Sequence, residues 1–332
     1  MLSRPSTNDA MQVKRKQRIR HDDHFSTRKS VEKCFDKAAL NYDANADVQK
    51  KAVSLLHQQV MLSEVQGTNA TRVQSAQISL DIGCGTGAIY RQLQSDIAYK
   101  SGAQNAQWLH LDISHAMLAK ARNLNDATWS SPHLANRPVS HFTQGDAYHL
   151  PVQSNVIQHV YSSMALQWCN NTALVLAEIS RILSTGGAAH LAIMIAPSFS
   201  HISECWQRAG YAPRVNTFLN AEDWITSLPA SLELVSSNEQ CITSQHKNLR
   251  ELLVSIKSVG ANATTTRSSI PSTTTTAATA SIAATTVDKV DNASQIKCLT
   301  RGELHDVEKE CSASNEGFML DYHLLFLHLR KR

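Results

Sequence analysis

The feature that most constrains the fold of this chain is a cluster of glycines directly after a short apolar segment. Residues Leu80–Gly87 read LDIGCGTG, although the whole chain of 332 residues has only 12 glycines. Glycine adopts backbone conformations that other residues avoid, so the cluster predicts a tight turn between a strand and a helix. In open α/β sheets such a turn lies at the carboxyl end of the first strand, where ligands bind.

Strand and helix patterns alternate from residue 78 onward. Short apolar segments predict strands at Ile78–Ile82, Trp108–Ile113, Val139–Thr143, Val156–Ser162 and Ala188–Ile195. Segments with apolar residues at helical spacing come between them, at residues 88–95, 116–123 and 172–183. This repetition predicts a doubly wound, mostly parallel α/β sheet of the Rossmann-like type.

The segments around this core suggest the domain organisation. We expect residues 1–29 to be a disordered basic arm and residues 30–332 to form one domain that begins with helices. Within it, residues 197–260 suggest a helical cap over a substrate. Residues 261–295, rich in Thr and Ala, suggest a disordered insertion, because they have too few large apolar side chains to form a core. A helix at residues 301–310 and a strand at 318–329 are expected to end the fold.

Composition and charge exclude several classes of protein. The net charge of +4 is too small for a typical nucleic-acid-binding domain, although it suits an acidic protein partner. The seven cysteines form no CxxC pair, and the histidines have no metal-ligand spacing, so we expect no bound metal and reduced thiols in the cytoplasm. The longest apolar run near a strand, Leu191–Ala196, is too short to cross a membrane.

The glycine turn predicts a site for a ligand with both a carboxylate and an ammonium group. Gly83, Gly85 and Gly87 let backbone amides approach the ligand, and the following helix N-terminus favours a carboxylate. Asp81, at the end of the strand, is placed to pair with an ammonium group. The same residues also match the dinucleotide-binding pattern GxGxxA, so a NAD-binding domain remains an alternative at this point.

Polar residues at the ends of the next strands predict where a nucleoside would bind. Asp112, followed by Ile113, ends the second strand, where a carboxylate can accept hydrogen bonds from both ribose hydroxyls. Asp146 follows the third strand and can accept from an adenine amino group, while the amide of Ala147 donates to the ring. Ser163 lies at the end of the fourth strand and completes the predicted cofactor-binding set.

Five motifs then occur in a fixed order: DxGCGTG, LDxS, GDAxxLP, ALQW and LxEISRILxxGG. Their order and spacing resemble those of the class I S-adenosylmethionine-dependent methyltransferases. The resemblance implies the class I methyltransferase fold and S-adenosyl-L-methionine as cofactor. It assigns the cofactor to Asp81, Gly83, Gly85, Gly87, Asp112, Ile113, Asp146, Ala147 and Ser163.

Further segments narrow the resemblance. Residues 35–49 look like the N-terminal signature FxxAAxxYDxxAxxQ, and NTFL at Asn216–Leu219, SIKSVGAN at Ser255–Asn262 and LTRGEL at Leu299–Leu304 follow. Together they resemble the malonyl-[acyl-carrier-protein] O-methyltransferase family of biotin synthesis, over roughly residues 30–262 and 296–330. In that family NTFL is often NRFL; here Thr217 replaces the arginine.

The resemblance implies methyl transfer to the free carboxylate of a malonyl thioester on acyl carrier protein, or on CoA, with no nucleic-acid or membrane partner. Tyr42 is the candidate pocket residue near the methyl group, and Arg214 the candidate anchor for the carboxylate. The alternatives are a methyltransferase with another small-molecule or tRNA acceptor, a catalytically silent fold that binds a partner, and a dehydrogenase.

Overall fold

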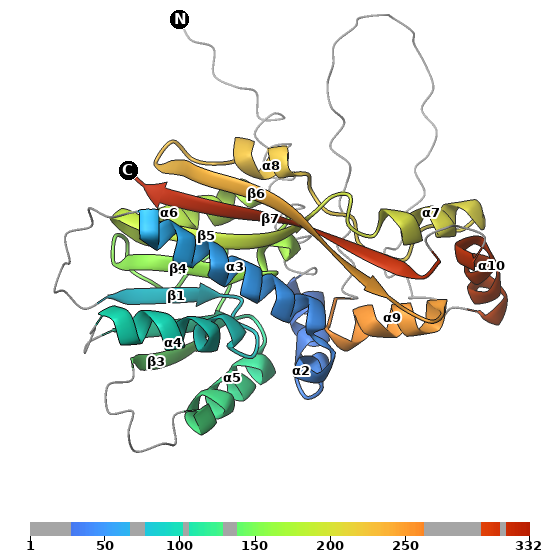
Figure 1. Cartoon of the computed structure of the whole chain (residues 1–332), viewed down its shortest axis with the longest axis horizontal. Coiled ribbons are helices and arrows are strands. Elements are labelled where there is room, and N and C mark those ends of the chain that lie inside the picture. The colour runs from blue at the N-terminus through green and yellow to red at the C-terminus, as the bar shows by residue number, and fades with distance from the viewer. Residues whose placement is uncertain (1–27, 67–76, 102–105, 129–137, 262–299, 313–316) are drawn as a thin grey trace, which may run out of the picture.

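The computed structural model describes residues 28–66, 77–101, 106–128, 138–261, 300–312 and 317–332. Within these residues, seven strands form one sheet in the order β3-β2-β1-β4-β5-β7-β6 (Figure 1). The strands are β1 (Ile78–Ile82), β2 (Gln107–Asp112), β3 (Val139–Gln144), β4 (Ile157–Ser163), β5 (Leu183–Ile195), β6 (Leu232–Gln245) and β7 (Met319–Lys331). The first five are parallel, and β7 runs antiparallel to both β5 and β6. The predicted doubly wound, mostly parallel sheet is confirmed.

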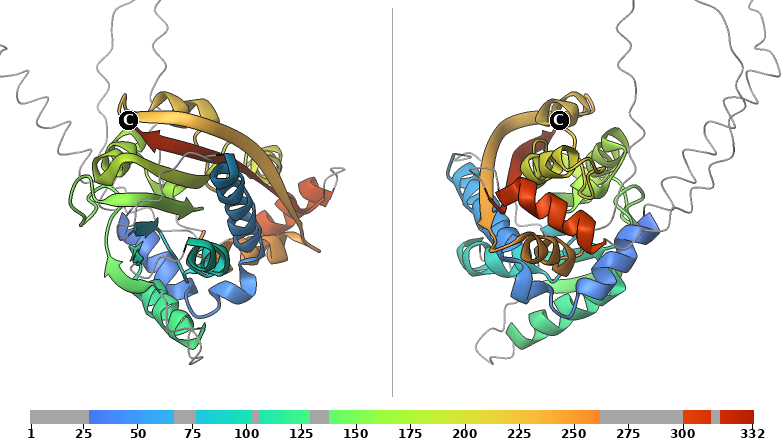
Figure 2. Two further views of the ribbon diagram at one scale, coloured as in Figure 1. Left: turned by 60° about the vertical axis from the view of Figure 1, so that its left-hand side comes forward. Right: turned by 90° about the vertical axis from the view of Figure 1, so that its right-hand side faces the viewer.

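Helices cover both faces of this sheet (Figures 1 and 2). They are α2 (Tyr42–Asn45), α3 (Asp47–Gln66), α4 (Ala88–Ser101), α5 (His115–Thr128), α6 (Thr172–Ile182), α7 (Ser200–Arg208), α8 (Ala221–Thr226), α9 (Leu249–Ser258) and α10 (Arg301–Ser312), with a short helix η1 (Leu166–Trp168) and a helix at residues 28–38. Apolar side chains of α3 and α4 pack on one face of the sheet, and those of α6 and α8 on the other. Burial of both faces explains the continuous apolar run Leu191–Ile195 in the central strand β5.

The strand β6 was not predicted, and it corrects the helical description of residues 197–260. Helices α7, α8 and α9 do lie in that range, but 14 residues of it form an edge strand of the main sheet. Most side chains of β6 are exposed, so its sequence has no apolar alternation. Backbone pairing with β7 along its whole length holds it in place instead.

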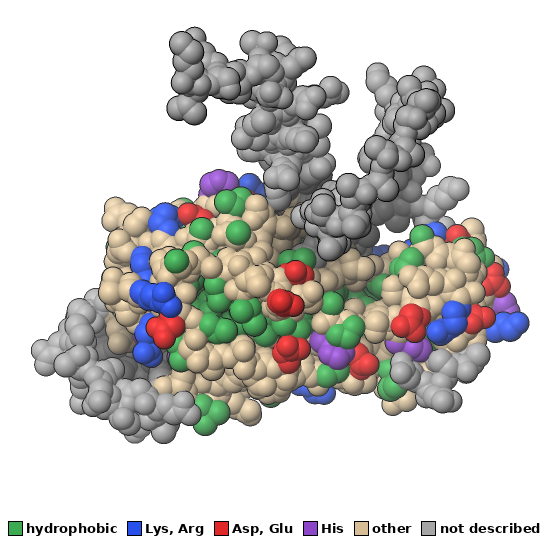
Figure 3. Space-filling model, turned by 90° about the horizontal axis from the view of Figure 1, so that it is seen from above, with side chains coloured by type: hydrophobic (Ala, Val, Ile, Leu, Met, Phe, Trp, Pro, Cys, Tyr) green, Lys and Arg blue, Asp and Glu red, His purple; other side chains and the backbone are tan. Residues whose placement is uncertain are grey.

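Most of the two predicted disordered segments lies outside the described residues. Of the basic arm, only Arg28 and Lys29 are described, and they begin the helix at residues 28–38 instead of belonging to an arm. Of the Thr/Ala-rich insertion, only Ala261 is described. No helix in the described ranges is both long and apolar enough to span a bilayer. Seen from above, apolar side chains gather in the middle of the surface beside several acidic ones, and most Lys and Arg side chains lie toward its two ends (Figure 3).

A row of polar and aromatic side chains crosses one buried face of the sheet. Strand register places Phe142, His110, Asp81, Tyr161, His190 and His328 side by side on successive strands from β3 to β7. The rings of Phe142 and His110 stack at 4.6 Å between centroids, and those of His190 and His328 at 4.4 Å. Burial lowers the pKa of His110 to about 4 and also lowers that of His190. These imidazoles are therefore neutral in the folded protein near pH 7.

Burial of neutral histidines predicts that stability falls in mild acid. In the unfolded chain His110 takes up a proton as pH drops through about 6.5, whereas in the fold it does so only near 4. Its stabilising contribution is therefore complete above pH 6.5 and is lost between 6.5 and 4, up to about 3 kcal/mol. When pH is lowered from 7.5 to 5, the free energy of unfolding should fall less for His110→Phe than for wild type. Urea denaturation at each pH measures this difference.

The exposed His149 provides the control for this prediction. His149→Gln should keep the pH dependence of the wild type, because it leaves the buried imidazoles in place. Equal pH slopes for His110→Phe and wild type would contradict the buried-imidazole explanation.

Candidate active site

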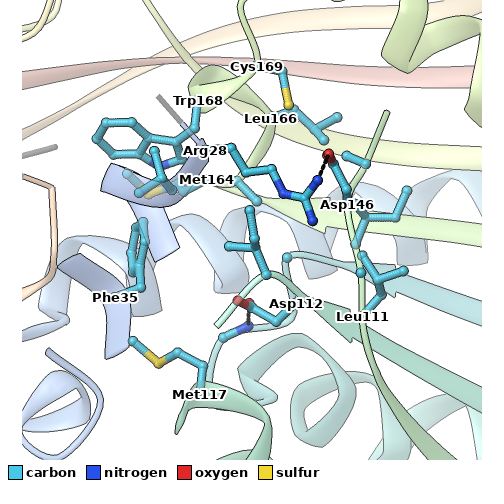
Figure 4. Close-up of a pocket in the computed structure, with 18 of the residues that line it drawn as sticks. Arg28, Phe35, Leu111, Asp112, Met117, Asp146, Met164, Leu166, Trp168 and Cys169 are labelled. Carbon is cyan, nitrogen blue, oxygen red and sulfur yellow. Dashed lines mark hydrogen bonds and ion pairs between the residues drawn. The ribbon is translucent and has the colours of Figure 1, made fainter. Parts of the chain in front are cut away.

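The main cavity lies at the carboxyl ends of β1 to β4, where α/β sheets bind their ligands. The helix at residues 28–38 and η1 close its sides (Figure 4). Its lining contains these predicted cofactor residues and the predicted pocket residue: Tyr42, Gly83, Gly85, Asp112, Ile113, Asp146, Ala147 and Ser163. A smaller cavity, lined by Asp81, shares Tyr42, Gly83, Gly85 and Ser163 with the main one. The structure thus places all but one of the predicted cofactor residues around two adjoining cavities; Gly87 lies behind them in the turn.

The glycine turn is held by backbone hydrogen bonds to the neighbouring strand. The amides of Gly83 and Cys84 both donate to the carbonyl oxygen of Leu111, at 2.7 and 3.0 Å. Gly83 has a φ of +67°, and a Cβ there would lie only 2.2 Å from the Cβ of Ala165. Any larger residue at this position would push the turn away from the end of β4, so glycine is required for steric reasons as well as for its backbone conformation.

Asp112 joins the glycine turn, the end of β2 and the start of α5, which form the floor of the main cavity. Its carboxylate accepts hydrogen bonds from the amide of Gly85 in the turn and from the amide of Ser114 before α5, each at 2.8 Å. Ser114 in turn caps α5, because its Oγ accepts from the amide of Met117 at 3.1 Å. Each Asp112 oxygen has a further lone pair, so the carboxylate still has room to accept from ribose hydroxyls.

Asp81 presents a buried carboxylate oxygen without a partner. The side chain is 1% exposed, and among the described residues neither its Oδ2 nor the buried Oγ of Ser163 has a hydrogen-bond partner. Burial raises the pKa of Asp81 strongly, and the nearby charge of Asp112 adds to the effect. A buried acceptor of this kind is costly unless a ligand satisfies it. An ammonium group in the smaller cavity would do so, which fits the methionine moiety of S-adenosyl-L-methionine.

The N-terminal signature fastens the covering helices to this floor. Asp36 Oδ1 accepts from Ser114 Oγ at 2.6 Å, ahead of α5. Asp43 Oδ1 accepts from Thr86 Oγ1 at 2.6 Å, and its other oxygen pairs with Lys120 at 2.8 Å. These contacts position Tyr42, which lies between the two cavities.

Aromatic and apolar side chains line the side of the main cavity. The rings of Phe35 and Trp168 meet edge to face, with centroids 5.9 Å apart. Met164 lies beside Trp168, and Met117 lies below Phe35 (Figure 4). Trp168, the last residue of the ALQW motif, lies in the cavity lining.

Arg28 is a cavity residue that the sequence analysis missed. Its Nη1 lies 3.2 Å from Oδ2 of Asp146, and the side chain crosses the cavity in Figure 4. The predicted acceptor for the adenine amino group is thus already engaged by a cation. The signal was present: Arg28, Val31 and Phe35 have helical spacing, and all three line the cavity.

Arg214, the predicted carboxylate anchor, is not among the residues that line either cavity. Its Nη2 lies 3.2 Å from Oε1 of Glu303 on α10, and its guanidinium lies 5.8 Å from the centroid of the Trp206 ring. The structure therefore gives this arginine a carboxylate partner within the chain, and its role toward a substrate stays a prediction.

Asp81→Asn is expected to change ligand binding and stability in opposite directions. The amide keeps the shape but removes an ionisable group whose burial is costly, so the ligand-free protein should have a higher free energy of unfolding, by about 1–3 kcal/mol. Loss of the charge partner for the ammonium should weaken S-adenosyl-L-methionine binding by about 10- to 100-fold, measured by calorimetry.

The exposed Asp47 provides a matched control, since Asp47→Asn removes a surface carboxylate, which pairs with Lys50 at 3.2 Å. It should change neither quantity appreciably. Asp81→Asn binding S-adenosyl-L-methionine as tightly as wild type would exclude the proposed ammonium site.

Cofactor binding is also expected to depend on pH through Asp112. Burial raises the pKa of Asp112 to about 6, and a bound ribose would favour the ionised carboxylate as acceptor. Affinity should therefore be full above pH 6 and should fall as pH drops below it, by up to about tenfold per pH unit. We expect titrations from pH 8 to 5 to show this step in wild type and a smaller pH dependence in Asp112→Asn. Identical pH profiles would argue against the role of Asp112.

Part of this chain matches a known protein family, and several known proteins are similar to most of it. Residues 80–191 match a family described as "Methyltransferase domain". A malonyl-[acyl-carrier protein] O-methyltransferase from Alcanivorax borkumensis is 29% identical over 304 residues, covering 91% of this chain and 86% of that protein. The protein of the same name from a Marinomonas species is 28% identical, covering 72% and 79%. A biotin biosynthesis bifunctional protein from Cellvibrio japonicus is 26% identical, covering 71% of this chain and 41% of that protein.

Among solved structures, a protein described as a methyltransferase from Bacillus halodurans aligns with a TM-score of 0.49 at 13% identity. The alignment covers 81% of this chain and 98% of that one.

Proposed function

We propose that this chain, a class I S-adenosyl-L-methionine-dependent methyltransferase, methylates the free carboxylate of a malonyl thioester carried on acyl carrier protein. The methyl ester would start pimeloyl synthesis for biotin. The prediction of a methyltransferase with this methyl donor, made from the ordered motifs, is confirmed by the methyltransferase domain at residues 80–191 and by the named relatives. The NAD-dependent alternative has no support.

The length over which this chain aligns with its named relative is the observation that supports a malonyl thioester as the acceptor. The relative from Alcanivorax borkumensis aligns over 91% of the chain, far beyond residues 80–191. The alignment therefore includes segments on either side of the methyltransferase domain, among which are the helices over the cavity and the region of α7 to α9. Similarity confined to residues 80–191 would support a methyltransferase without supporting a malonyl acceptor.

The reaction needs little acid–base chemistry from the protein. S-adenosyl-L-methionine supplies an electrophilic methyl group on a positively charged sulfur when it is bound. The malonyl carboxylate is already ionised at neutral pH, so no general base is required. Burial raises the pKa of Tyr42 above its usual value, so its hydroxyl keeps its proton. We therefore give Tyr42 an orienting role as a hydrogen-bond donor.

The apolar wall of the cavity favours this chemistry. Phe35, Met164 and Trp168 exclude water from the side of the cavity next to Tyr42. A displacement in which a carboxylate and a sulfonium cancel their charges is favoured where water is excluded. Correct alignment of the two reactants contributes further, by as much as about 7–11 kcal/mol in well-oriented systems.

Two arginines are candidates to hold the malonyl carboxylate. Arg28 lies in the main cavity, whereas Arg214 pairs with Glu303 outside its lining. We retain Arg214 from the sequence and add Arg28 from the geometry. An increase in KM for the acceptor with little change in kcat, in Arg28→Ala or in Arg214→Ala, would identify the anchor. The cytoplasmic location and the absence of nucleic-acid or membrane partners stay predictions.

The decisive experiment is mass spectrometry of malonyl-acyl carrier protein incubated with the enzyme and the methyl donor. We expect the mass to rise by one methyl group, and Asp81→Asn to slow the reaction through weaker donor binding. Malonyl-CoA, free malonate and succinyl-acyl carrier protein serve as comparison acceptors. An unmodified malonyl carrier in the presence of an enzyme that binds the donor would overturn the proposed acceptor. It would point to another small molecule or to tRNA.

A further inference from the structure

Three side chains of metal-ligating type converge where α7 meets α10, outside the two cavities described above. His201 and Cys205 are four residues apart on α7 and so face the same side of that helix. Cys311 comes from α10. The ring nitrogen of His201 and the two sulfurs all lie within 4.8 Å of one another. Figures 1 and 2 show the two helices side by side at one end of the molecule.

The spacing of these atoms is close to that of a tetrahedral zinc site. With Zn–S near 2.3 Å and Zn–N near 2.0–2.1 Å, the ligand atoms of such a site lie about 3.6–3.8 Å apart. Nε2 of His201 and Sγ of Cys205 are 3.8 Å apart. Closing the whole cluster around an ion requires at most about 1 Å of side-chain movement.

The surroundings favour a soft cation. Both thiols are fully buried, and Nη2 of Arg208 donates to Sγ of Cys205 at 3.3 Å. The carbonyl oxygen of Gly317 lies 3.0 Å from Nε2 of His201 and accepts a hydrogen bond from it, and a bound ion would take the place of that proton. Two thiolates would balance the charge of a divalent ion, and thiolate with imidazole selects zinc over calcium or magnesium.

We propose that His201, Cys205 and Cys311 form a structural zinc site that fastens α10 to α7. The expectation of no bound metal arose because Cys205 and Cys311 are far apart in the sequence, where no short motif can join them. The polar contacts already between the two helices include Arg208 with Glu310 at 3.6 Å, which is weak. A metal ion would add a strong link at the same contact.

The test is the metal content of the full chain, purified in a reducing buffer with trace zinc. We expect about one zinc per chain by mass spectrometry of the metal. After replacement by cobalt we expect the absorption bands of tetrahedral cobalt with thiolate ligands. Cys205→Ser and Cys311→Ser should lose both signals. Cys241→Ser is the matched control, since Cys241 is an exposed cysteine on β6, near the half-buried Asp321 and His323 of β7, and it should keep both.

His201→Ala keeps the test decisive if the cysteine variants do not fold, because this side chain is only partly buried. It should weaken cobalt binding by at least about tenfold while the far-ultraviolet circular dichroism stays unchanged. Chelation should lower the Tm of wild type but not that of Cys311→Ser. A folded wild-type protein with no retained zinc and no cobalt–thiolate bands would overturn the proposal. So would a disulfide between Cys205 and Cys311 in protein kept under reductant.

Discussion

The hydrogen bonds of the Asp112 carboxylate are the contacts on which the rest of the site depends. One oxygen holds the glycine turn after β1, and the other holds the chain just before α5. A single side chain therefore sets the relative positions of the turn, the end of β2 and the start of a helix. Burial raises the pKa of the Asp112 carboxyl to about 6, and hydrogen bonds from a bound ribose would favour its ionised form. The same side chain therefore holds the turn in place and lines the cavity where the ligand would bind.

The N-terminal helices depend on the same floor. Asp36 reaches Ser114 and Asp43 reaches Thr86, so the covering segment is attached at the two points that Asp112 has already fixed. This gives a physical reason for the spacing of the signature FxxAAxxYDxxAxxQ. Phe35 and Tyr42 occupy the cavity side, and the two carboxylates next to them in sequence hold their backbone in place. A covering segment attached only by apolar contacts would have less defined register over the ligand.

The sequence predicted the parts of the fold whose burial follows a simple period. The expected bounds Ile78–Ile82 of β1 agree with the structure. The sequence did not reveal β6, because an exposed edge strand is held by its backbone and shows no apolar alternation. It also missed Arg28, whose role depends on a helix turning it toward Asp146. The pairing of Arg214 with Glu303 joins residues that are distant in sequence, and only the packing of α10 brings them together.

The two long antiparallel strands extend the sheet beyond its parallel part. β7 pairs with β5 from His323 to Arg330, while its first residues pair with β6 alone. Phe199, just before α7, donates its amide to Asp321 in that extension and packs its ring against Tyr322. The helices at this end are therefore attached to a strand pair that contributes none of the lining of the main cavity. Substitutions at this end can therefore change how α7 is held without altering the residues that line the main cavity.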